Sequence, residues 1–229
     1  MRRILPYLGR LWTTDAGLTT LLASLLIYIF LLYPLGGLPL VKFFSNVFFS
    51  LILIAGAITV SRNRIFRMLV FSWGLLAFIF LWTRYLFPHQ VFVFVSTCLA
   101  LGFLVLLICL ILGQTLREGP TTYHRIMEAV AAYLILGVMC SLAYYLIELW
   151  APGAFNIQVP FAPGDREALR PHFFYFSFVT LTTVGYGDIV PIHPVARTLV
   201  ILEGVAGQLF PAILIARLVS LHVQSKQKS

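Results

Sequence analysis

Thr183-Val184-Gly185-Tyr186-Gly187, followed by Asp188, is the stretch that decides the fold of this chain. Its two glycines can adopt backbone angles that would strain most other residues, so successive carbonyl oxygens can point toward one axis. Thr183 can add its hydroxyl oxygen at the inner end of that row. The loop lies between two apolar helix candidates. This context favours an oxygen-lined cation site over the alternative, a glycine-rich hairpin turn.

The sequence around this loop, FFYFSFVTLTTVGYGD at residues 173–188, resembles the pore region of tetrameric potassium channels. The likeness covers roughly residues 123–221. It implies an outer helix, a short pore helix, a selectivity filter and an inner helix, repeated four times around one axis. In such a filter, carbonyl oxygens replace the hydration shell of K⁺. The implied filter is Thr183, Val184, Gly185, Tyr186 and Gly187, with K⁺ at the first four of these residues.

Three residues are expected to support the filter. Asp188 resembles the acidic residue at the outer mouth of these channels, whose family role is a hydrogen bond to a pore-helix side chain. Tyr175 occupies the matching position, where simple bacterial members carry tryptophan, and its hydroxyl can donate to a carboxylate. A solvated carboxylate that only concentrates cations is the alternative for Asp188. Thr182, directly before the filter, completes the group.

The composition indicates an integral membrane protein. Of the 229 residues, 60% are hydrophobic and 10% are charged, against roughly a quarter charged in soluble domains. Cys98, Cys109 and Cys140 lie in apolar runs without metal or disulfide spacing. No catalytic motif is present, so we expect no enzyme activity and no cofactor other than K⁺ as the permeant ion.

The fold class predicted is an all-α membrane protein with six transmembrane helices plus a re-entrant pore helix and filter loop. The segments of spanning length are residues 18–32, 43–60, 68–86, 91–112, 126–149 and 195–219. A cleaved signal peptide is the competing interpretation of the first segment, and the missing small-x-small site favours a retained helix. The pore helix is expected at residues 171–182, with Pro171 in its first turn.

The distribution of positive charge predicts the topology. Basic residues gather at one side of the six segments: Arg2, Arg3, Arg10, Arg62, Arg64, Arg67, Arg117, Arg125, Arg217, Lys226 and Lys228. The opposite loops hold only Lys42, Arg84, Arg166, Arg170 and Arg197. The positive-inside rule therefore places both termini in the cytoplasm. The net charge of +8 follows these loops, so anionic lipid is the expected neighbour and nucleic acid is not.

The domains are expected at residues 1–113, a four-helix transmembrane domain; 114–125, a cytoplasmic linker; 126–221, the pore domain; and 222–229, a short cytoplasmic tail. The first domain has the helix count of a voltage sensor without its arginines, since no charged residue lies between His89 and Arg117. Gating charges are what couple a sensor to voltage. Either a packing collar or a site for lipid or another membrane protein is consistent with these helices.

The last apolar segment holds a candidate gating hinge at Gly207 and Pro211. Gly207 lies nineteen residues after Asp188 and matches the hinge glycine of the family. Pro211 has no N–H, so it leaves the Gly207 carbonyl without a helical partner. The alternative is that the glycines only permit close helix packing. Gln208, the next residue after Gly207, is expected to face the cavity.

Glu203 is a carboxylate within the same apolar segment, where an acid usually faces a cavity or a partner. Three interpretations are open. Glu203 is protonated, or it pairs with an arginine, or it hydrogen-bonds to the base of the pore helix through Thr180 or Thr182.

These observations together predict a homotetrameric K⁺-selective channel in a membrane, expected to be the bacterial plasma membrane. It would conduct passively and largely independently of voltage. A weakly selective cation channel and a non-conducting regulatory subunit are the two alternatives.

Overall fold

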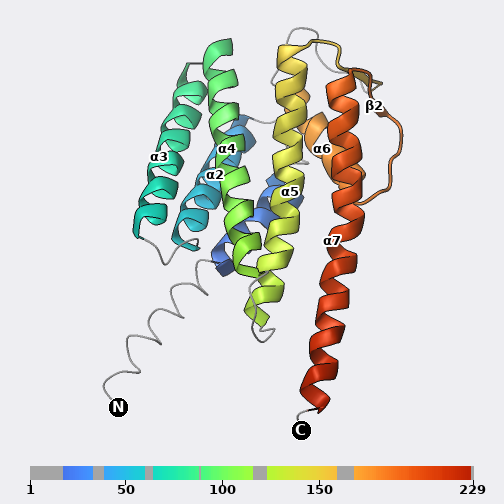
Figure 1. The fold of residues 1–229 in the computed structure, drawn as a ribbon. Coiled ribbons are helices and arrows are strands. Elements are labelled where there is room, and N and C mark those ends of the chain that lie inside the picture. The colour runs from blue at the N-terminus through green and yellow to red at the C-terminus, as the bar shows by residue number, and fades with distance from the viewer. Residues whose placement is uncertain are drawn as a thin grey trace. The chain divides into compact units, whose positions relative to one another are not determined.

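The computed structural model describes residues 18–32, 39–59, 64–87, 89–115, 123–158 and 168–227. Its contacts form two compact units (Figure 1). Unit 1 comprises Met1–Arg117 with Tyr123–Ala132, and unit 2 comprises Glu118–Thr122 with Tyr133–Ser229. The division therefore falls inside a helix, whereas the sequence places the boundary in the linker 114–125.

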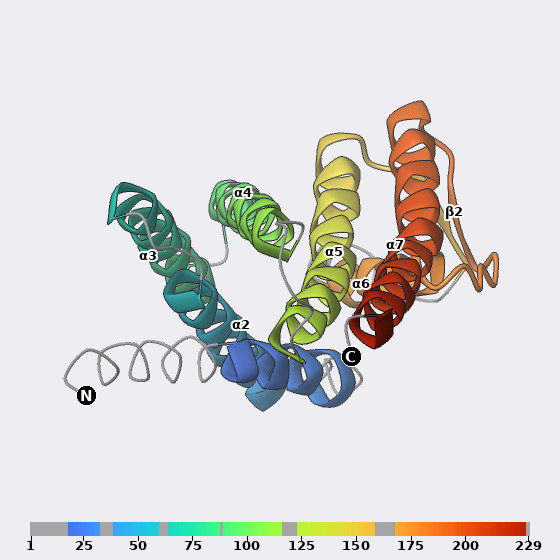
Figure 2. The same ribbon diagram turned by 60° about the horizontal axis from the view of Figure 1, so that its bottom comes forward.

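Unit 1 is built from apolar helices. The first runs over Leu18–Phe30 and ends in a π-helical turn, η1 (Tyr28–Leu32). The helices α2 (Pro39–Thr59), α3 (Arg64–Leu86) and α4 (Gln90–Thr115) follow. The strongest contacts join α3 to α4 and α2 to α3 (Figure 2). Most of their buried side chains are aliphatic or aromatic, so hydrophobic burial and close packing contribute most to holding this unit together.

Helices α3 and α4 interlock through two glycines. A Cβ on Gly74 would lie 3.1 Å from the ring of Phe103, and a Cβ on Gly102 would lie 2.7 Å from the ring of Trp73. Each glycine therefore accommodates an aromatic ring of the other helix. The Trp73 indole N–H also donates to the Leu99 carbonyl at 3.0 Å. This packing requires the absence of a side chain at both glycines.

Arg84 is a buried basic residue of unit 1. It is counted with the loops in the topology prediction although it also falls within the expected segment 68–86, and it lies in the last turn of α3 with 7% of its surface exposed. Because an arginine can lay its aliphatic stem along apolar neighbours, it can be buried within an apolar helix.

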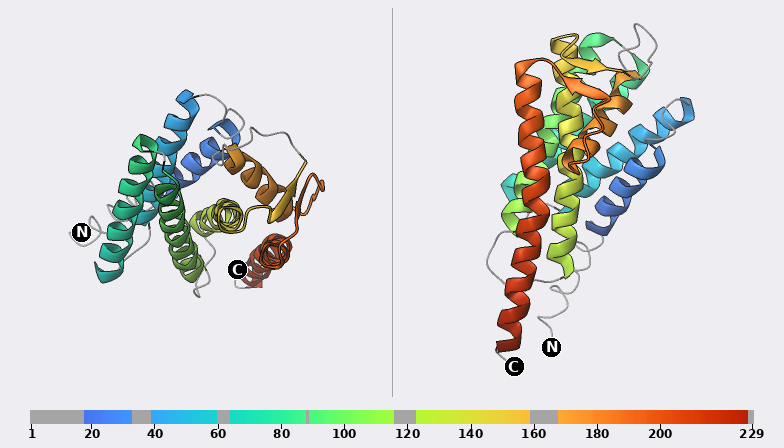
Figure 3. Two further views of the ribbon diagram at one scale, coloured as in Figure 1. Left: turned by 90° about the horizontal axis from the view of Figure 1, so that it is seen from above. Right: turned by 90° about the vertical axis from the view of Figure 1, so that its right-hand side faces the viewer.

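Unit 2 holds the remaining helices and a small sheet. The helices are most of α5 (Tyr123–Trp150), the short α6 (Leu169–Leu181) and the long α7 (Pro194–Gln227). Strands β1 (Phe155–Ile157) and β2 (Ile189–Pro191) pair antiparallel, with Asn156 opposite Val190 (Figure 3). The described chain is mostly helical, as expected, and a two-stranded ribbon is added to the predicted helices. The prediction missed it because three-residue strands carry almost no periodic signal.

Three described helical stretches are long and apolar enough to cross a membrane: Gln90–Gly113, Ile126–Trp150 and Pro194–Ala216. Shorter apolar helices cover Leu18–Phe30, Phe43–Ala55 and Val70–Arg84. Helix α6 has 13 residues, too few to span a bilayer. It begins two residues earlier and ends one residue earlier than expected, and Pro171 does lie in its first turn, where its missing N–H leaves no helical bond unmade.

Several expectations lie outside the described residues. They include the arginines of residues 1–17, Arg62, Arg117, Arg166 and Lys228, most of the linker 114–125, and residues 159–167 of the loop before α6.

Candidate functional site

The loop at residues 183–187 begins where α6 ends. Thr182 terminates the helix: its N–H donates to the Phe178 carbonyl at 3.0 Å, and its hydroxyl donates to the same oxygen at 2.7 Å. The Thr183 N–H then donates to the Thr180 carbonyl at 2.9 Å. Thr182 thus closes the helix from both its backbone and its side chain, and the loop leaves α6 from a defined position.

The next two loop residues fold back onto α6. The N–H groups of Val184 and Gly185 both donate to the Val179 carbonyl, at 3.0 Å and 3.3 Å. Among the described residues, the recorded backbone hydrogen bonds of 183–187 use these N–H groups and none uses a carbonyl oxygen of the loop. The first three donors of the loop, those of Thr183, Val184 and Gly185, are therefore satisfied by the helix, while the acceptors remain available for another partner.

The backbone of the loop has positive φ at every second residue. The values are 61° at Thr183, 56° at Gly185 and 80° at Gly187. Thr183 is the non-glycine residue with positive φ in the described part of the chain. A β-branched residue in this region is a true outlier, and such strain, on the order of 1–3 kcal/mol, gathers at functional sites.

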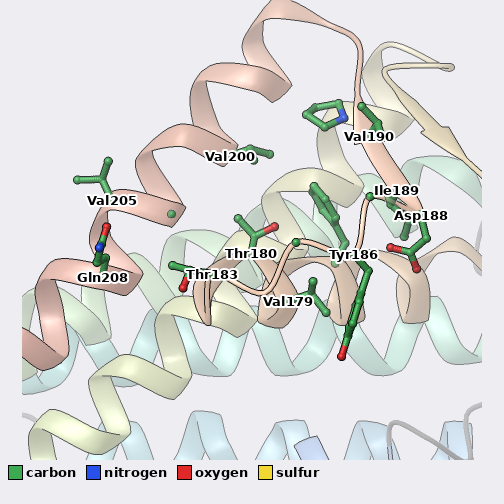
Figure 4. Close-up of a pocket in the computed structure, with 15 residues that line it drawn as sticks. Val179, Thr180, Thr183, Tyr186, Asp188, Ile189, Val190, Val200, Val205 and Gln208 are labelled. Atoms are coloured by element: carbon green, nitrogen blue, oxygen red, sulfur yellow. The ribbon is translucent and has the colours of Figure 1, made fainter.

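The loop opens onto a pocket of about 490 Å³ within unit 2 (Figure 4). Thr183, Gly185, Tyr186 and Gly187 line one side, and Val200, Gly204, Val205 and Gln208 of α7 line another. Gln208 and Thr183 therefore border the same space. Val184 and Tyr186 are 52% and 71% exposed in the single chain, so much of the loop has no cover within it.

The outer end of the loop is held by side chains of α6. The rings of Tyr175 and Tyr186 stack at 6.4 Å with an angle of 2° between their planes. Burial, followed by a hydrogen bond and the negative charge of Asp188, raises the pKa of Tyr175. The Tyr175 phenol thus remains a donor to the Asp188 carboxylate at ordinary pH.

A histidine shares this end of the site. Burial lowers the pKa of His172, and the nearby negative charge of Asp188 offsets part of that effect. The neutral imidazole is therefore favoured over the imidazolium at neutral pH.

The β1–β2 ribbon fixes the chain beyond the loop. The Gln158 N–H donates to the Asp188 carbonyl at 3.1 Å. The carboxylate of Glu148, at the end of α5, accepts the N–H groups of Gly153 at 2.7 Å and Phe155 at 3.2 Å. Sequence reasoning did not identify Glu148. An acid shortly before a Pro-Gly turn was the available signal, since carboxylates commonly accept the N–H groups of turns.

Helix α6 is attached to α5 by two side-chain hydrogen bonds. The Ser177 hydroxyl donates to the Gly137 carbonyl at 2.7 Å, and the Tyr133 hydroxyl donates to the Leu181 carbonyl at 3.2 Å. A Cβ on Gly137 would lie 2.8 Å from the ring of Phe178. Gly137 therefore allows α5 and α6 to approach closely. Ser177 was also missed, although a serine between two phenylalanines of an aromatic helix is a recognisable signal.

Glu203 reaches α6 at a different residue from the one expected. Its carboxyl contacts the Ser177 hydroxyl at 2.5 Å and the Tyr144 hydroxyl, whereas the sequence analysis names Thr180 or Thr182. Thr182 instead bonds to the Phe178 carbonyl of its own helix. Glu203 does bond to α6, as one of its three interpretations states, but its partner Ser177 lies one helical turn or more before the expected threonines.

The two proposed hinge residues lie in a continuous helix. Helix α7 runs through Pro211 without interruption. A Cβ added to Gly207 would collide with the backbone carbonyl of Leu181, two residues before Thr183. Gly207 therefore has a close-packing role next to the loop, and the hinge itself remains a prediction.

Comparisons with known proteins match the second half of the chain to ion channels. A family model described as an ion channel matches residues 133–224. Protein LctB of Bacillus caldotenax is 32% identical over 87 residues, which cover 38% of this chain and 64% of that protein. The inward rectifier potassium channel Kirbac3.1 of Paramagnetospirillum magnetotacticum is 35% identical over 85 residues, covering 35% and 24%. Two-pore potassium channel 4 of Arabidopsis thaliana is 36% identical over 96 residues, covering 42% and 32%.

The chain spans less than two thirds of the length of each of these relatives. Residues 133–224 are thus similar to an ion-channel family and to potassium channels, and three described helical stretches are apolar and long enough to cross a membrane. They point to a channel rather than an enzyme.

Proposed function

We propose that this chain forms a homotetrameric K⁺-selective channel that conducts passively and with little dependence on voltage. The observation that carries the proposal is the loop 183–187. The N–H groups of Thr183, Val184 and Gly185 are bonded to the end of α6, and the carbonyl oxygens of the loop have no backbone partner among the described residues. Carbonyl oxygens so arranged can replace the water ligands of a dehydrated K⁺.

The backbone angles of the loop support this chemistry. In an extended strand, successive carbonyls point to opposite sides. Positive φ at Thr183, Gly185 and Gly187 alternates with ordinary values at the residues between them, so the loop departs from the strand pattern. We infer that its oxygens turn toward a common axis, with the Thr183 hydroxyl at the inner end.

The exposed surface of unit 2 supports a tetramer. One loop supplies only part of a coordination shell, so several copies must meet at one axis. Val184 and Tyr186 of the loop are more than half exposed, and α7 exposes Ile201, Leu202 and Val205 to the same extent or close to it. Apolar surface of this kind requires cover from lipid or from other copies of the chain.

The proposed membrane arrangement has six spans, with α6 entering and leaving from the outer side. The shorter apolar helices of unit 1 would then cross with their flanking residues in the interfaces. The C-terminal end of α6 would face the inner part of the pore, where its dipole favours a cation. We infer that both termini lie in the cytoplasm and that the membrane is a bacterial plasma membrane, with anionic lipid beside the basic loops; the charge distribution of the sequence supports this orientation.

Flux measurements on purified protein test the proposal. The protein in liposomes with an outward K⁺ gradient should take up Rb⁺ and should take up little Na⁺. Comparable uptake of Na⁺ would favour a weakly selective cation channel. Absence of any uptake by a correctly assembled tetramer would favour a non-conducting regulatory subunit.

A further inference from the structure

A buried carboxyl joins the three helices of unit 2. Glu203 of α7 has 2% of its surface exposed. One of its oxygens accepts a hydrogen bond from the Tyr144 hydroxyl of α5, and the other lies 2.5 Å from the Ser177 hydroxyl oxygen of α6. The residue therefore touches both helices that hold the loop in place.

The number of protons in this cluster limits its chemistry. The Ser177 oxygen lies 2.5 Å from Glu203 and 2.7 Å from the Gly137 carbonyl oxygen. A serine hydroxyl has one hydrogen and cannot donate to both. With an ionised Glu203, one of these two short contacts would lack a proton. With a protonated Glu203, the acid donates to Ser177, Ser177 donates to Gly137, and Tyr144 donates to the other oxygen of the acid.

The surroundings of Glu203 favour the neutral acid. The ionisable groups that face it from α5 are Tyr133, Cys140 and Tyr144, and α6 contributes the Ser177 hydroxyl. None of these groups is basic. A buried carboxylate without a positive partner is costly in a protein interior and more so in a membrane, whereas the protonated form satisfies each of the recorded contacts.

The cluster affects the loop indirectly, through α6. Ser177 directly precedes Phe178, Val179 and Thr180, whose carbonyls receive the N–H groups of Thr182, Thr183, Val184 and Gly185. A shift of Ser177 therefore moves the acceptors that orient the loop.

We propose that Glu203 is a positioning residue of the filter and that it works as a neutral acid. The proton of Glu203 forms the hydrogen bond to the Ser177 hydroxyl of α6. Loss of this proton at alkaline pH draws the Ser177 hydroxyl away from Gly137 and lowers K⁺ flux. This inference depends on the proposed function for its effect on flux, but the protonation of Glu203 can be observed without any flux.

The main test compares Glu203→Gln with Glu203→Leu in liposomes over about pH 6 to 10, a range that includes the pKa values documented for buried carboxyls. Glutamine is neutral, donates to Ser177 and accepts from Tyr144. Glu203→Gln should therefore keep Rb⁺ flux within about twofold of the native protein at neutral pH and remove the alkaline decline. Glu203→Leu removes the hydrogen-bond partner of Tyr144 and one of the two partners of Ser177, and it should lower flux by about tenfold or more.

A matched pair of serine variants controls for packing. Ser177→Ala should reduce flux and flatten its pH profile. Ser141→Ala removes a buried hydroxyl of α5 that bonds only to the Val138 carbonyl of its own helix, at 2.7 Å, and should change neither. An inactive but tetrameric Glu203→Gln, or a Glu203→Gln protein that declines at the same alkaline pH as the native one, would overturn the proposal.

Infrared difference spectroscopy separates this inference from the proposed function. The native protein at neutral pH should show the carbonyl stretch of a protonated carboxylic acid, and Glu203→Gln should lack it. If that band is absent, the inference fails even where K⁺ flux is normal. If the band is present and native protein carries no K⁺, the proposed function fails and the protonated acid stands.

Discussion

Helices α4 and α7 are both long and apolar, yet they are covered very differently. Within the chain, 44% of the apolar span of α4 is buried, against 11% of the span of α7. Helix α4 contains no charged residue, whereas α7 carries the buried Glu203 and the pocket-lining Gln208. A helix that packs within its own chain can be held by side chains of complementary shape, as the glycine-aromatic contacts of α3 and α4 illustrate. In the proposed channel, the uncovered apolar surface of α7 would meet other copies of the chain, and Gln208 would line the aqueous path.

The largest effect is expected at the loop beside α7. Gly185 has a φ of 56°, and placing an L-residue in this region costs about 1–2 kcal/mol for each of four loops. Gly185→Ala should therefore lower Rb⁺ uptake by at least about a hundredfold. The control is Gly113→Ala in α4, where an added Cβ meets nothing within 4 Å. Equal flux in the two variants would remove the loop from the conduction path.

A smaller effect should separate close packing from hinge motion in α7. Gly207→Ala forces a Cβ against the Leu181 carbonyl, and overpacking of this kind costs about 1–3 kcal/mol. Rb⁺ uptake should fall by about tenfold, with weaker discrimination against Na⁺. Pro211→Ala restores an N–H that can donate to the Gly207 carbonyl, so it should shift open probability and leave selectivity unchanged.

Single-channel recording of both variants and of the double variant distinguishes these roles. Equal shifts in open probability with unchanged selectivity in Gly207→Ala would favour the hinge over the packing role. Additive effects in the double variant would show that the two residues act independently.

A modest effect is expected from acid at the outer end of the loop. Because burial lowers the pKa of His172, the imidazole is neutral at pH 7 and gains its proton only below the ordinary histidine range. The positive charge beside Asp188 should then reduce K⁺ entry by about twofold. The decline should appear as external pH falls and should disappear in His172→Gln. An identical acid profile in that variant would place the titrating group elsewhere.

The smallest effect concerns voltage and tests unit 1. Each elementary charge that crosses the field supplies about 2.3 kcal/mol per 100 mV, and α4 has no charge to move. Open probability should change little between about −100 and +100 mV. A steep conductance–voltage relation, measured in planar bilayers, would mean that other groups of unit 1, such as the buried Arg84, carry gating charge.

The helices and the loop could be anticipated from local sequence, and the contacts around the loop could not. Long apolar runs and the paired glycines are local signals, so the segments and the position of residues 183–187 follow from them. The bond from Glu203 to Ser177 depends on how α5, α6 and α7 face one another, which no local pattern records. The β1–β2 ribbon was missed for the same reason, because the pairing of Asn156 with Val190 joins residues on either side of α6.

The most direct test of the account is the reversal potential of purified protein in planar bilayers with K⁺ on one side and Na⁺ on the other. The loop at 183–187 predicts a reversal potential near that of a membrane permeable to K⁺ alone, with K⁺ at least about tenfold more permeant than Na⁺. In Gly207→Ala the reversal potential should lie closer to zero than in the native protein. A reversal potential near zero in the native protein would contradict the assignment of these residues as a K⁺-selective filter.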